Sequence, residues 1–217
     1  MNELTNQKIA ALRVDYCLKV FDESEVLENP MLQFEHWIKE AIEAEVNEPN
    51  AMTIATVNPN GTPSARVVLL KGFTQNGFTF FTNYDSHKGQ QLIGNPNIAV
   101  VFCWLELQRQ VRIEGTVTKL SNQENDEYFY SRPLDSQIGA LASPQSKIIP
   151  SRMVLEQNFE KVKNNLSNQK IMRPENWGGF FINPNLVEFW QGRSSRLHDR
   201  FEFTKDGSNW KRNRLAP

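Results

Sequence analysis

Three side chains that carry or can gain a positive charge alternate along one short segment near the C-terminus. The segment reads RLHDR and contains Arg196, His198 and Arg200, a few residues after Trp190. Side chains of an extended chain point alternately to opposite faces, so the spacing predicts that these three share one face and that Asp199 points away. A cluster of this kind needs an anionic or heteroaromatic partner. A solvated edge strand is the alternative, and the nearby tryptophan favours a binding site.

A second pair of cations stands at the two ends of a run rich in β-branched residues. Arg66 and Lys71 are five residues apart, so a regular strand would point them to opposite faces. A bulge or the strand twist could still bring them to one ligand. Two solvated charges at the ends of a buried strand are the alternative, which this pair alone favours.

The segment FTNYDSHKG joins the end of a strand to the start of a helix. Ser86 is placed to cap that helix, and Thr82 and Lys88 stand on either side of the cap. Free backbone N–H groups, a hydroxyl and a lysine at a helix N-terminus make a phosphate site. An ordinary capped helix is the alternative, and this segment alone favours it.

The segment YFYSRPLDS could hold a second phosphate. Tyr128 and Arg132 are four apart and share a helix face, and Ser136 is expected in the loop that follows. A helix end stopped by Pro133 is the alternative. Gln110, at the start of another strand, could pair with the edge of a heterocycle.

The elements that must position these residues are mostly strands. Helices are predicted from Asn29-Pro30, from Ser86, from Ser121 and from Pro150-Ser151, on capping and periodicity. Six to eight strands are expected, and the segment 98–104 reads as buried on both faces. Strands at this frequency predict a barrel rather than a doubly wound sheet. The strand candidates are 53–57, 65–73, 78–82, 98–104, 111–120, 179–183, 187–191, 200–204 and about 210–215.

Composition describes an ordinary globular chain. It has 217 residues, 39% of them hydrophobic, and a net charge of −1, which argues against non-specific nucleic-acid binding. Cys17 and Cys103 form neither a disulfide framework nor a CxxC site, which fits a reducing cytoplasm. No secretory signal or membrane-spanning run is found, and no metal site is expected. Residues 1–28 are polar, and a mobile N-terminal arm is one interpretation of them; 29–217 is expected to be a single domain.

Eight segments in order resemble the pyridoxamine 5′-phosphate oxidase family, and the resemblance runs from about residue 10 to the C-terminus. The tail WKRNRLAP is also similar to the family's C-terminus. The segments are RVVLLK at 66–71, FFTNYDSHKG at 80–89, RQV at 109–111, YFYSRPLDSQIGA at 128–140, SPQS at 143–146, WGGF at 177–180, EFWQG at 188–192 and RLHDRF at 196–201.

The resemblance implies a fold, a cofactor and a reaction. The fold would be a split β-barrel, mainly β with short flanking helices, in a homodimer with FMN at the interface. The reaction would be the oxidation of pyridoxamine or pyridoxine 5′-phosphate to pyridoxal 5′-phosphate, with O₂ as acceptor and H₂O₂ as product.

The resemblance also implies roles for individual residues. The FMN positions are Arg66, Val67, Val68, Leu69, Leu70, Lys71, Phe81, Thr82, His87, Lys88, Gln110, Gln145, Ser146, Trp190 and Arg200. The substrate positions are Lys71, Tyr128, Arg132 and Ser136 for the phosphate, Arg196, Leu197 and His198 at the ring, and Arg13 and Tyr16 as a lid. Arg196 would orient the ring and stabilise charge near the reacting carbon, and His198 would position the ring. No obligatory protein base is evident.

Two departures from the family pattern matter. His87 stands where the family usually has arginine, and histidine gives a weaker, pH-dependent phosphate contact. After Tyr16 the usual basic, glycine-containing continuation is missing, which weakens the case for a lid. A split-barrel flavoprotein with another substrate and a non-catalytic carrier of pyridoxal phosphate are the alternatives. The segments YSRPLDS and RLHDR argue against another substrate.

Overall fold

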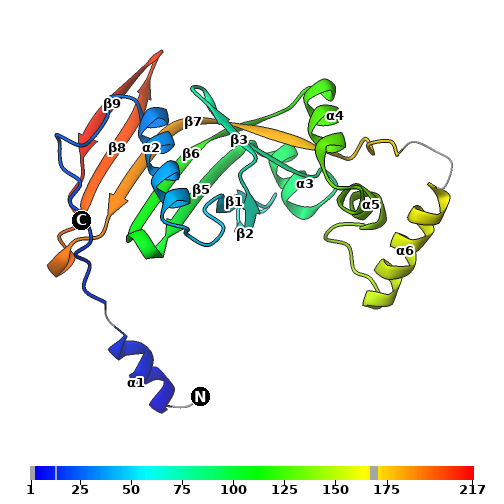
Figure 1. The fold of residues 1–217 in the computed structure, drawn as a ribbon, viewed down its shortest axis with the longest axis horizontal. Coiled ribbons are helices and arrows are strands. Elements are labelled where there is room, and N and C mark those ends of the chain that lie inside the picture. Colours follow the sequence, from blue (N-terminus) through cyan, green and yellow to red (C-terminus); the bar gives the residue numbers. More distant parts are fainter. Residues whose placement is uncertain (1–2, 13, 167–170) are drawn as a thin grey trace.

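The computed structural model describes residues 3–12, 14–166 and 171–217. Within them the chain forms one curled antiparallel sheet with helices at its edges, so the expected mainly β fold with flanking helices is confirmed. The sheet contains nine strands, one more than the largest number expected. Figure 1 shows the sheet in the middle of the molecule, with α4, α5 and α6 at one end and the β8–β9 hairpin at the other.

The main path through the sheet runs β2-β1-β5-β6-β7-β4-β3, and β8 and β9 continue from β7. β2 therefore lies at an edge, with β1 as its ladder partner. The strands are β1 Ala51–Val57, β2 Pro63–Leu69, β3 Gly72–Thr74, β4 Gly77–Asn83, β5 Asn97–Trp104, β6 Arg109–Lys119, β7 Trp177–Gln191, β8 Asp199–Asp206 and β9 Asn209–Arg214.

One long strand, β7, joins the two ends of the sheet. Its first half pairs with β4 and its second half with β8, while β6 runs along both halves. The prediction of two separate strands at 179–183 and 187–191 was wrong, because Pro184 lies at a bulge opposite Gly115 rather than in a turn. A Cβ on Gly115 would lie 2.1 Å from the Asn183 carbonyl oxygen, so only glycine fits this crossing.

The helix α2 fills the concave side of the sheet. Asn29 caps it by accepting from the Met31 N–H, and Pro30 occupies its first turn, as predicted. The ring of Phe34 packs edge-on against Phe78 at 4.9 Å, and Trp37 packs against Phe189 at 5.2 Å. The helices are α1 Glu3–Ala11, α2 Pro30–Glu43, α3 His87–Gly94, α4 Asn122–Ser131, α5 Leu134–Ala142 and α6 Arg152–Asn165, with 3-10 turns at Leu105–Leu107 and Ser194–Arg196.

A second, smaller core lies where α4, α5 and α6 meet the start of β7. Phe129, Ile138, Ile171 and Trp177 form its buried centre. A loop was expected after Pro133, but the structure has α5 there, because proline fits the start of a helix as well as the end of one.

Two strand predictions need correction. The strand expected over 65–73 ends at Leu69, and Lys71 lies between β2 and β3. The segment 98–104 alternates between buried and more exposed residues in this chain, with Cys103 exposed. It therefore buries one face only, where burial on both was expected.

The N-terminal segment after α1 runs along the end of the sheet. Phe21 is 2% exposed and packs on Trp37 and Phe201. The backbone N–H groups of Cys17 and Leu18 donate to the side-chain oxygen of Gln108 at 3.0 and 3.3 Å. Figure 1 shows α1 itself lying apart from the sheet.

Candidate functional site

A cleft of about 740 Å³ lies between the edge strand β2, the end of β4 and the helices α3, α4 and α5. Four cationic side chains line it, and no Asp or Glu is among the described residues that do so. They are Arg66, Lys71, Lys88 and Arg132. Four cations without an acid, in a chain whose net charge is −1, make this cleft a site for anions.

The break after β2 brings the first two cations to the cleft. Arg66 lies within the strand, and Lys71 leaves it two residues after the last paired position. Thr56, Ser64 and Gln91 hold the Arg66 guanidinium: Nη1 donates to the Thr56 hydroxyl, and Nη2 donates to Ser64 Oγ at 2.6 Å and Gln91 Oε1 at 3.2 Å. Burial lowers the pKa of Arg66, so an anion here would relieve a desolvated charge.

A second corner of the cleft is built by the start of α3. Ser86 caps this helix by accepting from the Gly89 N–H, as predicted. Lys88 Nζ lies 3.2 Å from Thr82 Oγ1 and 3.3 Å from Gln145 Oε1, so these three groups meet at one point. Burial and the charge of Arg66 lower the pKa of Lys88. His87 is exposed beside this corner and does not line the cleft.

The far wall carries aromatic rings and a guanidinium. The ring of Phe81 stacks on Tyr128 at 3.9 Å, and the Arg132 guanidinium lies 4.6 Å from the centre of the Trp177 ring. Arg132 Nη2 donates to the Ser136 carbonyl at 2.8 Å, and the buried Nη1 has no hydrogen-bond partner among the described residues. Burial lowers the pKa of Arg132 and raises that of Tyr128.

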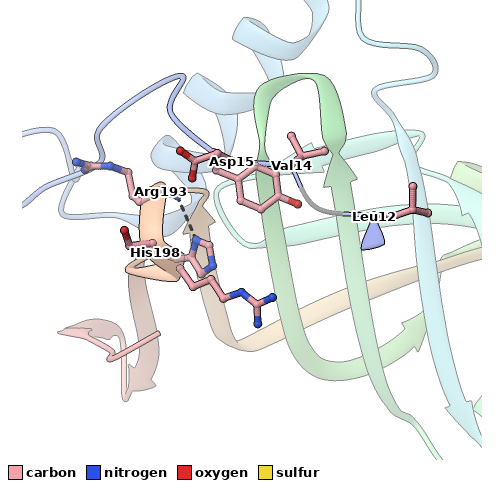
Figure 2. Close-up of a pocket in the computed structure, with 8 residues that line it drawn as sticks. Leu12, Val14, Asp15, Arg193 and His198 are labelled. Atoms are coloured by element: carbon pink, nitrogen blue, oxygen red, sulfur yellow. Dashed lines mark hydrogen bonds between the residues drawn. The ribbon is translucent and has the colours of Figure 1, made fainter. Parts of the chain in front are cut away.

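A separate pocket of about 840 Å³ lies at the other end of the sheet, between the N-terminal segment and the turn before β8. Its lining includes Tyr16, Arg193, Arg196 and His198. Figure 2 shows Arg193 and His198 joined by a hydrogen bond on one side of this pocket. The ring of His198 lies 4.5 Å from that of Trp190 and 5.9 Å from that of Tyr16, so three rings gather here.

The imidazole of His198 has a fixed orientation. The backbone N–H of Arg193 donates to His198 Nδ1 at 3.1 Å. A ring nitrogen that accepts a hydrogen bond carries no proton, so the neutral ring has its proton on Nε2. Burial and the charges of Arg196 and Arg200 lower the pKa of His198, which favours the neutral ring.

The pairing of the strands places three of the predicted FMN residues in one row. Gln110 of β6 lies opposite Trp190 of β7, which lies opposite Arg200 of β8. Directly opposite residues share a face of the sheet. Arg200 Nε donates to Glu188 Oε1 at 2.8 Å, and Glu188 is buried.

The predicted alternation of Arg196, His198 and Arg200 along an extended strand was wrong. Ser195 and Arg196 adopt left-handed conformations, with φ values of 55° and 60°, in a 3-10 turn, and β8 begins only at Asp199. Arg196 and His198 line the pocket, whereas Arg200 is held in the sheet by Glu188.

The predicted site residues therefore fall into two groups and a remainder. Leu70 is buried, and Ser146 and Leu197 are exposed and line neither the cleft nor the pocket. Arg13 lies outside the described residues. The cleft contains Arg66, Val67, Val68, Leu69, Lys71, Phe81, Thr82, Lys88, Tyr128, Arg132, Ser136 and Gln145, and the pocket contains Tyr16, Arg196 and His198.

Several lining residues were not predicted from the sequence. Asp15, Arg193 and Ser195 line the pocket, and Asn83 and Trp177 line the cleft. All five stand in or next to segments that the sequence analysis had singled out, so closeness to those segments was the available signal.

An antiparallel half-barrel with a cation-lined cleft beside its edge strand places this chain in the class of split-barrel proteins. The family model described as "Pyridoxamine 5′-phosphate oxidase" matches residues 38–165, and that of the "Pyridoxine 5′-phosphate oxidase C-terminal dimerisation region" matches 177–217. The chain belongs to the pyridoxamine 5′-phosphate oxidase family.

Individual proteins agree with this assignment. A pyridoxine/pyridoxamine 5′-phosphate oxidase of Trichormus variabilis is 54% identical over 98% of this chain and 100% of its own length. Among solved structures, PhzG from Burkholderia lata 383, in complex with tetrahydrophenazine-1-carboxylic acid, is 28% identical, covering 92% of this chain and 98% of its own with a TM-score of 0.86. A pyridoxamine 5′-phosphate oxidase-related, FMN binding protein from Nostoc punctiforme shares the fold, with 18% identity, a TM-score of 0.69 and coverage of 85% and 97%.

Proposed function

We propose that this protein oxidises pyridoxamine 5′-phosphate and pyridoxine 5′-phosphate to pyridoxal 5′-phosphate, with FMN as cofactor. The observation that carries the proposal is the cleft with four cations and no acid among its described lining residues, in a chain of this family. Cofactor and substrate each carry a phosphate, and two phosphates need about this much positive charge.

The donor set in the cleft fits FMN. Arg66, Thr82, Lys88 and Gln145 offer charged and neutral donors for its phosphate. β2 has a ladder partner on one side only, so backbone groups of residues 67–69 are free to pair with the edge of a flavin ring. When bound, FMN supplies the acceptor for a hydride from the substrate.

The substrate's phosphate would take the other side of the cleft. Lys71 and Arg132 provide charge, and Tyr128 and Ser136 provide hydroxyl groups. The desolvation that lowers the pKa of Arg132 is relieved when a dianion lies against the guanidinium. Binding there would leave the substrate's ring outside the phosphate corner, in need of a second set of contacts.

We infer that a second copy of the chain supplies those contacts. Arg196 and His198 line the pocket and not the cleft, and the row of Gln110, Trp190 and Arg200 is also outside the cleft lining. Figure 1 shows β8 at one end of the sheet and α4 and α5, which line the cleft, at the other. A two-fold dimer can bring the pocket of one copy to the cleft of the other. The match of residues 177–217 to a dimerisation region supports this arrangement.

In that arrangement each residue at the ring has a distinct task. His198 has its proton on Nε2. That N–H would donate to a substituent oxygen on the substrate's pyridine ring and so fix the rotation of the substrate. Arg196 would lie against the pyridine ring, orient it for the reaction and stabilise negative charge on the groups around the reacting carbon. Tyr16 closes over Trp190 and His198 and excludes water. Dioxygen as the final acceptor, with hydrogen peroxide as product, belongs to the same proposal.

A different substrate is the competing proposal, and the likeness to PhzG supports it. That protein's ligand is a tricyclic carboxylic acid without a phosphate. Two cations of the cleft are taken up by a cofactor phosphate, which leaves Lys71 and Arg132 for a substrate anion. A phosphate uses both of them together with the two hydroxyl groups nearby, so the cleft favours the phosphorylated substrate.

The test is an oxidation assay with matched substrates. The purified protein, loaded with FMN, is given pyridoxamine 5′-phosphate, pyridoxine 5′-phosphate or unphosphorylated pyridoxamine, and oxygen uptake and aldehyde absorbance are followed together. We expect turnover with both phosphates and at least about a 100-fold lower kcat/KM without the phosphate, equivalent to losing about 2.7 kcal/mol of charged contacts. If neither pyridoxamine 5′-phosphate nor pyridoxine 5′-phosphate caused oxygen uptake, the proposal would be refuted.

A further inference from the structure

The carboxylate of Asp199 joins three segments that are far apart in the sequence. Asp199 is the first residue of β8 and is 7% exposed. Oδ2 accepts from the Phe21 N–H at 3.1 Å and from Arg193 Nη1 at 2.7 Å, and Oδ1 accepts from Arg214 Nη1 at 3.0 Å. Hydrogen bonds to a charged acceptor are about twice as strong as neutral ones, so this carboxylate is a firm junction.

Two of the three partners of Asp199, Arg193 and Phe21, belong to the segments that form the pocket and cover it. Arg193 donates its backbone N–H to His198 Nδ1 and thereby sets the position of the Nε2 proton. Phe21 anchors the N-terminal segment, in which Tyr16 lies edge-on against Trp190 at 5.9 Å.

The turn that Asp199 holds is strained. Ser195 and Arg196 have φ values of 55° and 60°, a conformation that costs about 1 kcal/mol or more for residues other than glycine. Such a conformation persists only where neighbouring contacts enforce it. The bonds at Arg193 and Asp199 stand at the two ends of this turn and provide that constraint.

We propose that Asp199 is a positioning residue for the reaction: its charge locks the N-terminal segment and the 193–198 turn into one unit, which presents the His198 Nε2–H to the substrate and holds Tyr16 over it. Asp199 touches neither substrate nor cofactor in this account. The proposal rests on the proposed function for its meaning, but its structural claim stands on the contacts alone.

The charge, rather than the size, of Asp199 is what the two guanidiniums need. An asparagine keeps the volume but replaces one acceptor oxygen by an NH₂ group, which cannot accept from Arg193 or from Arg214. We therefore expect Asp199→Asn to release the turn and the N-terminal segment together. Asp206→Asn is the matched control, because it makes the same change at the exposed end of the same strand.

Two measurements on the FMN-loaded protein test the structural claim without any turnover. The first is ¹⁵N NMR of labelled histidine, in which the three histidines are separated by the loss of one signal in His198→Gln. We expect a single Nε2–H tautomer in the wild type and in Asp206→Asn, and a mixture in Asp199→Asn. The second is trypsin cleavage after Lys19, which we expect to be at least about tenfold faster in Asp199→Asn, since a tenfold change corresponds to 1.4 kcal/mol.

Kinetics then separate positioning from loss of the fold. We expect kcat/KM of Asp199→Asn to fall about tenfold or more, mostly through KM, with the FMN dissociation constant within about threefold of the wild type. Where Asp199→Asn does not fold, Arg214→Gln replaces it and should shift the same two structural readouts in the same direction, by less.

An unchanged His198 tautomer together with unchanged cleavage in the folded variant would overturn the proposal. Failure of the wild type to oxidise either substrate would instead refute the proposed function, while the tautomer and cleavage results would still decide the role of Asp199.

Discussion

At the scale of single residues, His87 lies beside the corner of the cleft that is proposed to hold the FMN phosphate, without lining the cleft itself. It begins α3, with its side chain exposed, one residue before Lys88. Arginine, which the family resemblance leads one to expect here, stays charged at every working pH, whereas histidine loses its charge near neutrality. We predict that His87→Arg binds FMN more tightly at pH 8, by about three- to tenfold. Flavin fluorescence quenching measures this, and equal affinity at pH 8 would contradict it.

Arg196 is predicted to act on turnover rather than on the cofactor. Its side chain lines the pocket with His198, whereas the proposed FMN contacts in the sheet come from Trp190 and Arg200. Arg196→Ala should lower kcat by about 100-fold while changing FMN affinity by less than about threefold. Arg152→Ala, a change at an exposed arginine of α6, is the control. Near-normal turnover in Arg196→Ala would remove that residue from the reaction.

The lowered pKa of His198 has a consequence for acid stability. Its ordinary value is 6.5, and burial with the charges of Arg196 and Arg200 lowers it in the fold. Below about pH 6.5 the unfolded chain therefore binds a proton that the folded chain does not, so stability falls as pH drops through this range. We predict that the free energy of unfolding, measured in urea, falls less between pH 7 and 5 for His198→Gln than for the wild type. His36→Gln is the control. Parallel profiles for the three proteins would count against this prediction.

At the scale of elements, a buried ion-pair row ties β6, β7 and β8 together. Glu188 accepts from Arg112 at 2.7 Å and from Arg200 at 2.8 Å, and its side chain is 2% exposed. Burial raises the pKa of this carboxyl, but the hydrogen bonds from Arg200 and Arg112 lower it by more. A glutamine here exchanges one acceptor oxygen for an NH₂ group, so one of the two guanidiniums loses its carboxylate acceptor.

Glu188→Gln should therefore destabilise the fold by about 2 kcal/mol and weaken FMN binding through Arg200. Glu202→Gln is the control, because Glu202 is more exposed and lies 3.9 Å from Arg112. Urea unfolding compares the two variants. A loss of stability no greater than that of the control would show that the row contributes little.

The elements also show what the sequence could and could not predict. Local chemistry was sufficient for the caps at Asn29, Ser86 and Ser121, because each is decided within four residues. It was insufficient for β7, where the pairing with β6 carries the strand through Pro184. The turn at Arg196 was missed for the same reason, since contacts from Asp199 and the N-terminal segment enforce a strained conformation that alternation does not predict.

At the scale of the whole molecule, the cleft and the pocket are lined by different elements of one sheet and its helices. Figure 1 shows α4 and α5, which line the cleft, at one end of the sheet and β8, which follows the turn at the pocket, at the other. The order of the motifs along the chain could not reveal that the cleft and the pocket are separate. The family resemblance implies which residues contact cofactor and substrate, but not which copy of the chain provides them. The cleft contains the four cations that are proposed to bind phosphate, and the pocket contains His198 and Arg196. The proposed reaction uses both regions, so the proposed site includes the dimer interface.

Activity of a designed heterodimer tests this account most directly. Two differently tagged chains are co-expressed, one with Arg132→Ala in the cleft and the other with Arg196→Ala in the pocket. If each site combines the cleft of one chain with the pocket of the other, one site of this heterodimer contains both substitutions and the other contains none. The heterodimer should then oxidise pyridoxamine 5′-phosphate at about half the wild-type rate. Placing both substitutions in one chain and none in the other should leave almost no activity. The reverse pattern, with the first heterodimer inactive and the second half-active, would contradict the account.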